Sequence, residues 1–559
     1  MGYVLLWIEH LAMGLLLLAT LVACISQLKR PWLRMALSVL VALPALIVYA
    51  LLLLILGHLR FRESIVVGMF GPLVMLTACY AIGVVWILFA GLRRRDDESA
   101  KASAWPRGKL ALVTFIAVGL HTMTWWNLDL AVRQQLASLP EEASALALSV
   151  APARIPDRDN AALLYEQTYE VLDPDSWSED RREKWAQWIE FDKQFDPDDP
   201  ELKSLLDEQT PTLILLRQAG RKPGCHFGRD YGRVNIATLL PGLKEVRRAA
   251  YLMALDARYR VAQGDVQTAL EDVDAIFAMV EHVGGDLFLV STLVAIAIDA
   301  TATETLQEVL ASQRKLPADK RITSEQLQAI DLDGRLSFRR LLSRALHAEM
   351  AAVLNTFEQI CCGDPEWTRV AVSKEGEYFD LAFPEESPCL DLYPQAQSFY
   401  RMFIATSDVA SYRNWMERFS RIAAKPYHEA RSELKEFNRR FESEPKDLMT
   451  AVFMPALSRM VRHQVHGDAR HRTARLALAA ARYRTENGRL PESLNQLAPD
   501  YIPILPRDPV DGKPMRYRLT DEGAVIYSIG LDRKDDHGTP LEQTGTDEET
   551  GDITFMLRP

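Results

Sequence analysis

Cysteine is scarce in this sequence, with six residues in a chain of 559. No two cysteines have the C-x-x-C spacing, which excludes a thioredoxin-like redox motif and a zinc ribbon. Cys24 and Cys79 lie in apolar runs, where a free cysteine serves as a small apolar side chain. The other four lie in the polar part of the chain: Cys225, Cys361, Cys362 and Cys389. Outside the cytoplasm these four can form disulfides in three pairings, and a bridge from Cys389 to Cys361 or Cys362 is favoured.

The common catalytic motifs are also missing. The patterns G-x-S-x-G, G-x-x-x-x-G-K-[ST], G-x-G-x-x-G and H-E-x-x-H do not occur. His463, His466 and His471 with Asp468 are residue types that bind transition metals, although a solvated helix end explains the group better. Cys225 is followed by a histidine, but sequence neighbours rarely reach the geometry of a thiolate and its base. We therefore expect Cys225 to be buried or disulfide-bonded.

A surplus of positive charge is missing as well. The chain has 64 Lys and Arg against 75 Asp and Glu, a net charge of −11. Residues 1–130 carry 11 basic and 6 acidic side chains, so the remainder carries 53 and 69, a net charge of −16. Nucleic acid requires a basic surface that neutralises phosphate, so it is not an expected partner. An acidic surface is compatible with solubility and with cation binding.

Long apolar runs, in contrast, are present, and all of them precede Asn127: Val4–Ile25, Leu33–Gly57, Ile65–Leu92 and Leu110–Trp126. A bilayer is crossed by about 20 apolar residues in helical form, because no backbone amide can stay unpaired in lipid. Lys and Arg are concentrated in the first and third connecting segments, which places these segments in the cytoplasm. The sequence therefore predicts a four-helix transmembrane anchor over residues 1–130, with everything after it outside the cytoplasm.

Residues 151–445 are predicted to form an α-helical soluble domain. Its clearest unit is an αα-hairpin over Leu243–His282, in which Gly264 closes the first helix and Asp265 caps the second. Leu287–Leu310 is apolar enough to resemble another membrane span. Its acidic residues and threonines favour a buried helix of a soluble domain instead.

Residues 446–559 are predicted to form a small α+β module. A helix is expected over Arg470–Asn487, followed by strands over Met515–Leu519 and Ala524–Ile529 with a turn at Asp521–Gly523. The module contains Asn-Gly-Arg-Leu-Pro from Asn487, Asp-Pro-Val-Asp-Gly-Lys-Pro from Asp508, Tyr-Ser-Ile-Gly-Leu-Asp from Tyr527, and Asp-Ile at Asp552. This order resembles the globular domain of the type II secretion major pseudopilin. The helix here is charged and follows about 470 residues instead of a prepilin-peptidase motif, so the resemblance does not imply assembly into a pseudopilus.

In that family the loop of this module binds calcium, and the resemblance implies a calcium site here. Asp532 and Asp552 match the motif positions, and Asp535 and Asp536 are further candidates by proximity. Calcium takes six to eight oxygen ligands, which carboxylates and loop carbonyls supply. The alternative is an exposed acidic loop that holds no metal.

The predicted fold class is therefore mainly α: a four-helix transmembrane anchor, an α-helical extracytoplasmic domain and a small C-terminal α+β pseudopilin-like module. The whole arrangement is similar to multi-spanning proteins of the bacterial envelope. We expect an inner-membrane protein in contact with the lipid bilayer and with an envelope protein partner, and with no nucleic acid. Its expected function is that of a scaffold or interaction protein linked to a secretion or pilus-like system. The alternative is a membrane-anchored hydrolase with its site in the helical domain.

Overall fold

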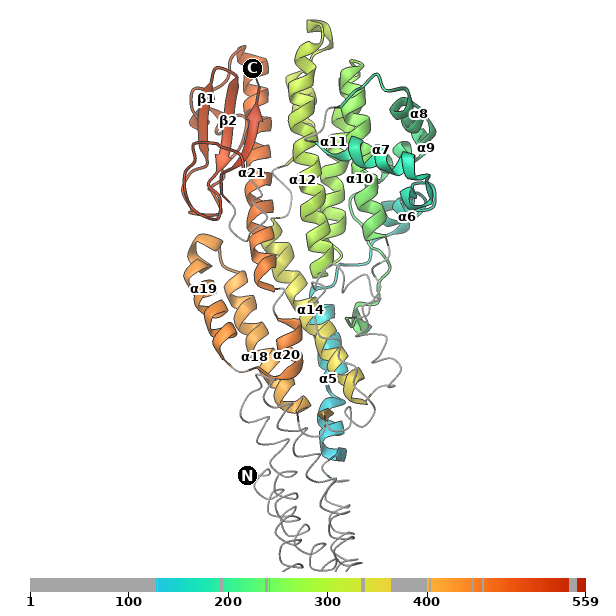
Figure 1. Ribbon diagram of the computed structural model, residues 1–559, viewed down its shortest axis with the longest axis vertical. Coiled ribbons are helices and arrows are strands. Elements are labelled where there is room, and N and C mark those ends of the chain that lie inside the picture. The colour runs from blue at the N-terminus through green and yellow to red at the C-terminus, as the bar shows by residue number, and fades with distance from the viewer. Residues whose placement is uncertain are drawn as a thin grey trace, which may run out of the picture.

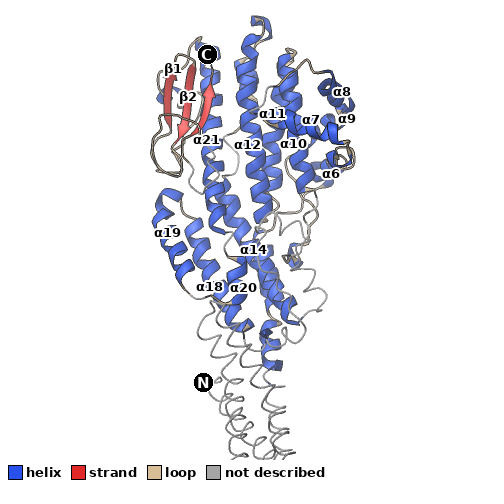
Figure 2. Ribbon diagram, viewed as in Figure 1, coloured by secondary structure: helices blue, strands red, loops and turns tan. Residues whose placement is uncertain are grey.

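The computed structural model describes residues 127–558, except for residues 128, 192–194, 237–239, 241, 333–336, 363–399, 402–403, 445, 455–456 and 542–549. This part of the chain is mainly helical and carries one three-stranded antiparallel sheet at its C-terminal end (Figure 2). Its buried apolar side chains form two clusters, which lie one above the other in the view of Figure 1 and are called the upper core and the lower core below.

The upper core is built on three long helices: α10 (Leu243–Ala262), α11 (Val266–Gly284) and α12 (Leu289–Ser312). The predicted αα-hairpin is confirmed. Gly264 has a φ of +84°, which glycine adopts without strain, and the Asp265 carboxylate accepts a hydrogen bond from the Thr268 amide, 3.2 Å. Short helices cover one side of these three (Figure 1): α6 (Ala162–Glu166), α7 (Glu179–Ile189), α8 (Pro200–Glu208) and α9 (Thr210–Gly220).

The predicted fold class needs a correction in the number of membrane spans. In the described part of the chain, one helical segment, Leu289–Lys315, is long and apolar enough to cross a membrane. Of its most apolar 18-residue window, 78% is buried among the neighbouring helices. The described residues thus contain one candidate span, and not the predicted four-helix anchor, whose four runs lie outside them. Length and hydropathy do not separate a span from a core helix, because a helix packed on all sides is apolar all round in either setting.

The lower core contains α5 (Leu139–Val150), α14 (Phe338–Cys362), α18 (Ala405–Ala423), α19 (Tyr427–Ser443) and α20 (Leu448–Phe453). Helix α14 packs on both α5 and α18. Aromatic rings join α18 to α19, with Trp415 at 5.3 Å from Phe437 and 5.2 Å from Phe441 between ring centroids, both in edge-to-face geometry.

Helix α21 (Leu457–Asn487) runs through both cores. It ends at the predicted Asn487 but begins 13 residues before the predicted Arg470. The first turns contribute Val461 and Val465 to the lower core, and the last turns contribute Leu476 and Ala480 to the upper core. A short helix, α13 (Ser324–Gln328), packs beside its upper half.

The sheet lies against the upper half of α21 (Figure 1). Its strands are β1 (Arg516–Thr520), β2 (Gly523–Ser528) and β3 (Ile553–Leu557), in the order β1-β2-β3. The predicted strands and turn are confirmed to within one residue. Thr520 pairs with Gly523 at the turn, and Ile526 of the central strand pairs with Phe555, which is fully buried.

Candidate functional site

Asp508 organises the loops at the end of the sheet. Its fully buried carboxylate accepts hydrogen bonds from the Val510 amide (2.8 Å), the Ser528 hydroxyl (2.8 Å) and the Ile529 amide (3.0 Å). Arg516 forms an ion pair with it at 2.5 Å. Burial raises the pKa of Asp508, while these partners act in the opposite direction. Two of the sequence motifs, the Asp-Pro run and the Tyr-Ser-Ile-Gly run, are thus joined through this side chain. The sequence analysis included Asp508 in a motif but assigned it no role.

The predicted calcium ligands lie on two segments that meet beyond β2. A Cβ atom at Gly530 would lie 2.2 Å from the Gly551 carbonyl oxygen and 3.3 Å from an Asp532 carboxylate oxygen. Only glycine therefore permits this close approach, which brings Asp532 next to the residue that precedes Asp552. The fold thus brings into contact the two segments that carry the aspartates matching the family motif.

Asp532 and Asp552 each keep one carboxylate oxygen without a partner. Asp532 Oδ1 accepts from the Lys534 amide (3.1 Å) and Asp552 Oδ2 accepts from the Gly538 amide (2.7 Å). Asp532 Oδ2 and Asp552 Oδ1 are buried and have no hydrogen-bond partner in the part of the chain that the structure describes. Burial raises the pKa of Asp552, and the nearby charges of Asp535 and Asp536 raise it further. A bound cation would compensate both the burial of this carboxylate and the negative charges near it.

Asp535 and Asp536 are placed differently. The Asp535 carboxylate accepts hydrogen bonds from the Tyr527 hydroxyl and the His537 amide, each at 3.0 Å, and lies 4.0 Å from Arg516. Asp536 accepts the Thr539 hydroxyl with its backbone carbonyl, 2.7 Å. Within the described ranges, no group of three or more His, Cys, Asp or Glu side chains has the geometry of a metal site. A calcium ion here would take Asp532 and Asp552 as carboxylate ligands and depend on backbone carbonyls and water for the rest.

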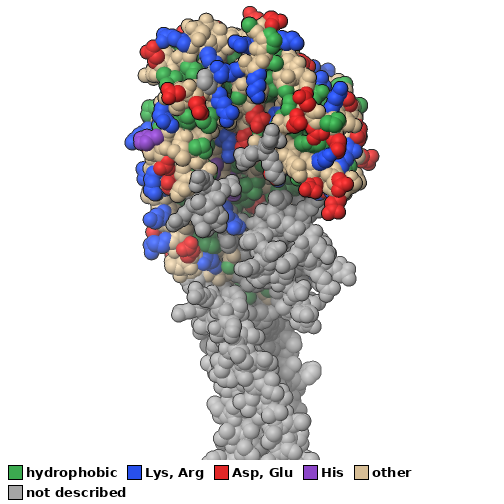
Figure 3. All heavy atoms as spheres, turned by 45° about the horizontal axis from the view of Figure 1, so that its top comes forward, with side chains coloured by type: hydrophobic (Ala, Val, Ile, Leu, Met, Phe, Trp, Pro, Cys, Tyr) green, Lys and Arg blue, Asp and Glu red, His purple; other side chains and the backbone are tan. Residues whose placement is uncertain are grey.

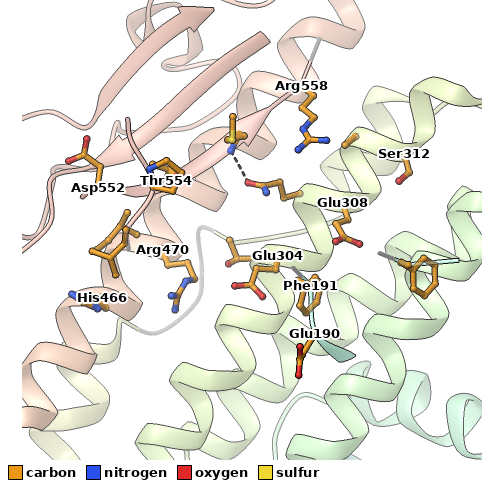
Figure 4. A pocket seen from close by; sticks show the side chains of 18 of the residues that line it. Glu190, Phe191, Glu304, Glu308, Ser312, His466, Arg470, Asp552, Thr554 and Arg558 are labelled. Carbon is orange, nitrogen blue, oxygen red and sulfur yellow. Dashed lines mark hydrogen bonds between the residues drawn. The ribbon is translucent and has the colours of Figure 1, made fainter. Parts of the chain in front are cut away.

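Asp552 also faces a cleft of about 920 Å³ between α12, α21 and β3. Figure 4 shows Glu304 and Glu308 on α12 and Arg470 on α21 reaching into this space, with Arg558 above and His466 below. The segment after α7, with Glu190 and Phe191, lines the side away from the sheet. The cleft residues come from positions more than 100 residues apart, and no sequence signal grouped them.

The cysteines and histidines considered from the sequence do not form a site among the described residues. Cys361 is buried and Cys225 is half-buried, and neither belongs to a disulfide among the described residues. Cys389 and the side chain of Cys362 lie outside the described residues, so the predicted bridge from Cys389 stays a prediction. Burial raises the pKa of Cys225 far above its usual range, which makes this thiol a poor nucleophile.

The histidines of α21 considered as a metal site point to different surroundings. His471 is hydrogen-bonded through Nδ1 to Asp299 of α12 at 2.7 Å, whereas His466 lines the cleft. Asp468 is buried and accepts from the Phe338 amide (3.0 Å) at the first residue of α14. These side chains hold helices together and are not arranged around one metal position.

Apolar side chains do not gather into one broad patch among the described residues on the face seen in Figure 3. Acidic and basic side chains are intermingled on the face seen in Figure 3, and apolar side chains form small separate patches. The large apolar side chains that are exposed belong to separate elements, for example Leu148 of α5, Ile214 of α9 and Leu519 of β1.

No protein-family model, curated protein or solved structure matches the chain.

Proposed function

We propose that this chain is a non-catalytic scaffold or interaction protein of the bacterial envelope, held at the inner membrane with the described part outside the cytoplasm. The apolar sequence before Asn127 and the distribution of Lys and Arg within it support the location. The resemblance of the C-terminal module to the major pseudopilin supports a link to a secretion or pilus-like system. In this proposal calcium stabilises that module.

One observation carries the calcium part of the proposal. Asp532 Oδ2 and Asp552 Oδ1 are buried without a partner in the described part of the chain, on two segments in contact through Gly530 and Gly551. An unsatisfied buried acceptor costs about 1–3 kcal/mol, and more if it is charged. Two such atoms on adjoining segments are expected where a cation binds.

Thermal unfolding of the full chain in detergent, with chelator or with millimolar calcium, tests this proposal. At about 100 times its dissociation constant, calcium is expected to stabilise the unit that binds it by roughly 2.7 kcal/mol. Asp532→Asn and Asp552→Asn are expected to lose this shift. Neither variant should be much less stable than the parent in chelator, because each removes an uncompensated buried charge.

Asp521→Asn is the matched control, because Asp521 is an exposed acidic residue in the β1–β2 turn. It should respond to calcium as the parent does. Equal unfolding temperatures of the parent with and without calcium would overturn the calcium site, and so would a shift that persists in Asp532→Asn and Asp552→Asn.

A second candidate function is a hydrolase, and the cleft is the observation that favours it. The cleft lies between α12, α21 and β3 beside the segment that follows α7, and His466, Glu304 and Glu308 line it. A histidine near carboxylates is a common source of general acid–base catalysis. Release of cleavage products from a peptide incubated with the chain, and their loss in His466→Gln, would favour this candidate over the scaffold.

A further inference from the structure

We propose that the cleft between α12, α21 and β3 binds the C-terminal end of an extended peptide. The peptide backbone pairs with Thr554 at the outer edge of β3, and the terminal carboxylate pairs with Arg470 of α21. The Thr303 hydroxyl of α12 bonds to the peptide from another wall of the cleft. This partner class deepens the interaction role proposed above and rests on it, but it does not depend on bound calcium.

The outer edge of β3 turns backbone groups toward the cleft. Met556 donates its amide to the side chain of Gln307 on α12, 2.8 Å, and not to β2. Backbone groups on one side of a strand recur at every second residue, so the Thr554 amide and carbonyl also point away from β2. Neither group has a hydrogen-bond partner in the part of the chain that the structure describes. An unpaired edge of this kind binds an extended peptide as an added strand.

The unpaired edge is short, because the positions on both sides of Thr554 are occupied. The Asp552 amide donates to the Thr539 carbonyl, 2.8 Å, where Pro540 forms a bridge beside the start of β3. On the other side Gln307 accepts the Met556 amide. A peptide that pairs with Thr554 therefore leaves the edge before it reaches Asp552, which favours a chain end at this point.

Arg470 supplies the charge that a free carboxylate at this chain end requires. Its guanidinium reaches into the cleft (Figure 4), and within the described ranges it makes no ion pair or side-chain hydrogen bond. Arg484 donates to the carbonyl of Arg558, 2.7 Å, at the far end of β3. Arg470 lies about four helical turns earlier on α21, so it is toward the Asp552 end of the strand. A carboxylate held there through two parallel hydrogen bonds sets the peptide antiparallel to β3.

Thr303 supplies an independent indication of a ligand. Its neighbours on α12 behave as helical threonines do: Thr301 donates to the Ala297 carbonyl (3.2 Å) and Thr305 donates to the Thr301 carbonyl (2.6 Å). The Thr303 hydroxyl lines the cleft, is 4% exposed, and has no partner among the described residues. A carbonyl or carboxylate oxygen of the peptide would satisfy it.

The size and charge of the cleft narrow the ligand class. Ligand pockets commonly measure about 300–1,000 Å³, so 920 Å³ accommodates several peptide residues. A small carboxylic acid would reach Arg470 but leave the backbone of Thr554 unpaired. Carboxylates that line the same cleft oppose a ligand with several negative charges: Glu190, Glu304, Glu308 and Asp552. A peptide end brings a single carboxylate, which one guanidinium binds.

The test uses the full chain in detergent and short peptides labelled at the N-terminus, each made with a free C-terminal carboxylate and as the C-terminal amide. An array of such pairs with varied residues selects the best sequence, and fluorescence anisotropy measures its affinity in chelator and again in calcium. We expect the free acid to bind about tenfold more tightly than the amide. On Arg470→Met this difference should disappear, because the pair is already broken. An amide that ends in glutamate should bind as weakly as the other amides.

Thr554→Pro tests the added strand. Proline removes the N–H that points away from β2 and leaves the ladder between β2 and β3 in place, and edge strands tolerate it. We expect peptide affinity to fall about tenfold while the unfolding temperature stays close to that of the parent. In the peptide, N-methylation at successive positions should weaken binding at alternate positions only, because alternate amides face β3.

Thr303→Val separates a ligand contact from a structural role. Valine has nearly the same shape and removes the unpaired hydroxyl, so the unfolding temperature of the free chain is expected to rise while peptide affinity falls. A purely structural hydroxyl would not change the two quantities in opposite directions. Arg459→Met, an exposed position on the same helix away from the cleft, is the control and should bind as the parent does.

Absence of saturable binding at millimolar peptide would overturn the inference. Equal affinity of the free acid and the amide would also overturn it, as would unchanged binding by Thr554→Pro or an equal loss in Arg459→Met. Peptide binding in chelator would leave the inference standing even if the calcium experiment failed. A calcium shift without peptide binding would leave the calcium site standing, so the two failures are distinguishable.

Discussion

Arg217 shows how this protein uses buried charge. Its guanidinium, on α9, donates to both oxygens of Asp272 on α11 at 2.7 and 3.1 Å and also bonds Asp256 on α10. Both carboxylates are fully buried and the Arg217 side chain is 14% exposed. One arginine thus holds three helices together at a point where apolar packing alone would not specify their orientation.

Arg217→Met is expected to reduce the free energy of unfolding by on the order of 3–5 kcal/mol, because it leaves the buried Asp272 without its cation. Asp256 keeps Arg260, which lies 3.2 Å from its carboxylate. Burial raises the pKa of Asp272 well above its ordinary 3.8, an effect that Arg217 opposes. The folded state therefore holds this proton more tightly than the unfolded chain, and ionisation costs stability as the pH rises. The loss in Arg217→Met should be largest at neutral pH and shrink as the pH falls toward about 4.

Denaturant unfolding of the full chain over this pH range measures the effect. Arg221→Met is the control, because Arg221 pairs with Glu271 at the surface and its side chain is 67% exposed. The control should change the stability by less than about 1 kcal/mol. A loss in Arg217→Met that does not vary with pH would contradict the assigned role of Asp272.

At the scale of elements, α21 depends on one glycine. Gly467 lies where α21 passes α12 and α14, and a Cβ there would lie 2.9 Å from the Phe338 ring and 3.3 Å from Ile296. The next residue, Asp468, accepts the Phe338 amide at the start of α14. The predicted helix started at Arg470, after Gly467, and glycine generally disfavours the interior of a helix. In the structure α21 continues through Gly467, where its packing against α12 and α14 stabilises the helical backbone.

Gly467→Ala is predicted to destabilise the protein although alanine favours helix. Alanine is more favourable than glycine inside a helix by about 1 kcal/mol, whereas forcing its methyl group against the buried Phe338 ring costs about 1–3 kcal/mol. Combining it with Phe338→Leu, which opens space, should recover part of the loss. Unfolding temperatures of the two single variants and the double variant measure this, and strictly additive losses would contradict the assigned contact.

At the scale of the whole molecule, α21 joins the two cores. Val465 is fully buried in the lower core and Leu476 is fully buried in the upper core, on one continuous helix. The pair of Asp299 and His471 adds a polar contact between α12 and α21. A change in either core is therefore transmitted to the other through a rigid element.

Leu476→Ala is expected to lower the stability by about 2–5 kcal/mol and Val465→Ala by less, since fewer methyl groups are removed. Because α21 belongs to both cores, each variant should raise hydrogen exchange in α10 and α11 as well as in α18. Exchange measured by mass spectrometry on the full chain tests this. An increase confined to the core that carries the substitution would show that the cores unfold independently.

Local patterns in the sequence determined a good part of this fold. The αα-hairpin of α10 and α11, the end of α21 at Asn487, and the strands β1 and β2 with their turn were all predicted, because caps, glycines and side-chain periodicity act over a few residues. The aspartates Asp532 and Asp552 were also selected from a motif, and the fold brings their segments together.

Tertiary structure alone decided the rest. The continuation of α21 through Gly467 and the cleft between α12, α21 and β3 both depend on contacts between residues far apart in the chain. The apolar composition of α12 alone is the same whether lipid or other helices surround it, and its acidic residues and threonines were the sequence signal that predicted the burial now seen. The partnerless Thr303 hydroxyl likewise becomes apparent only when every neighbour is in place.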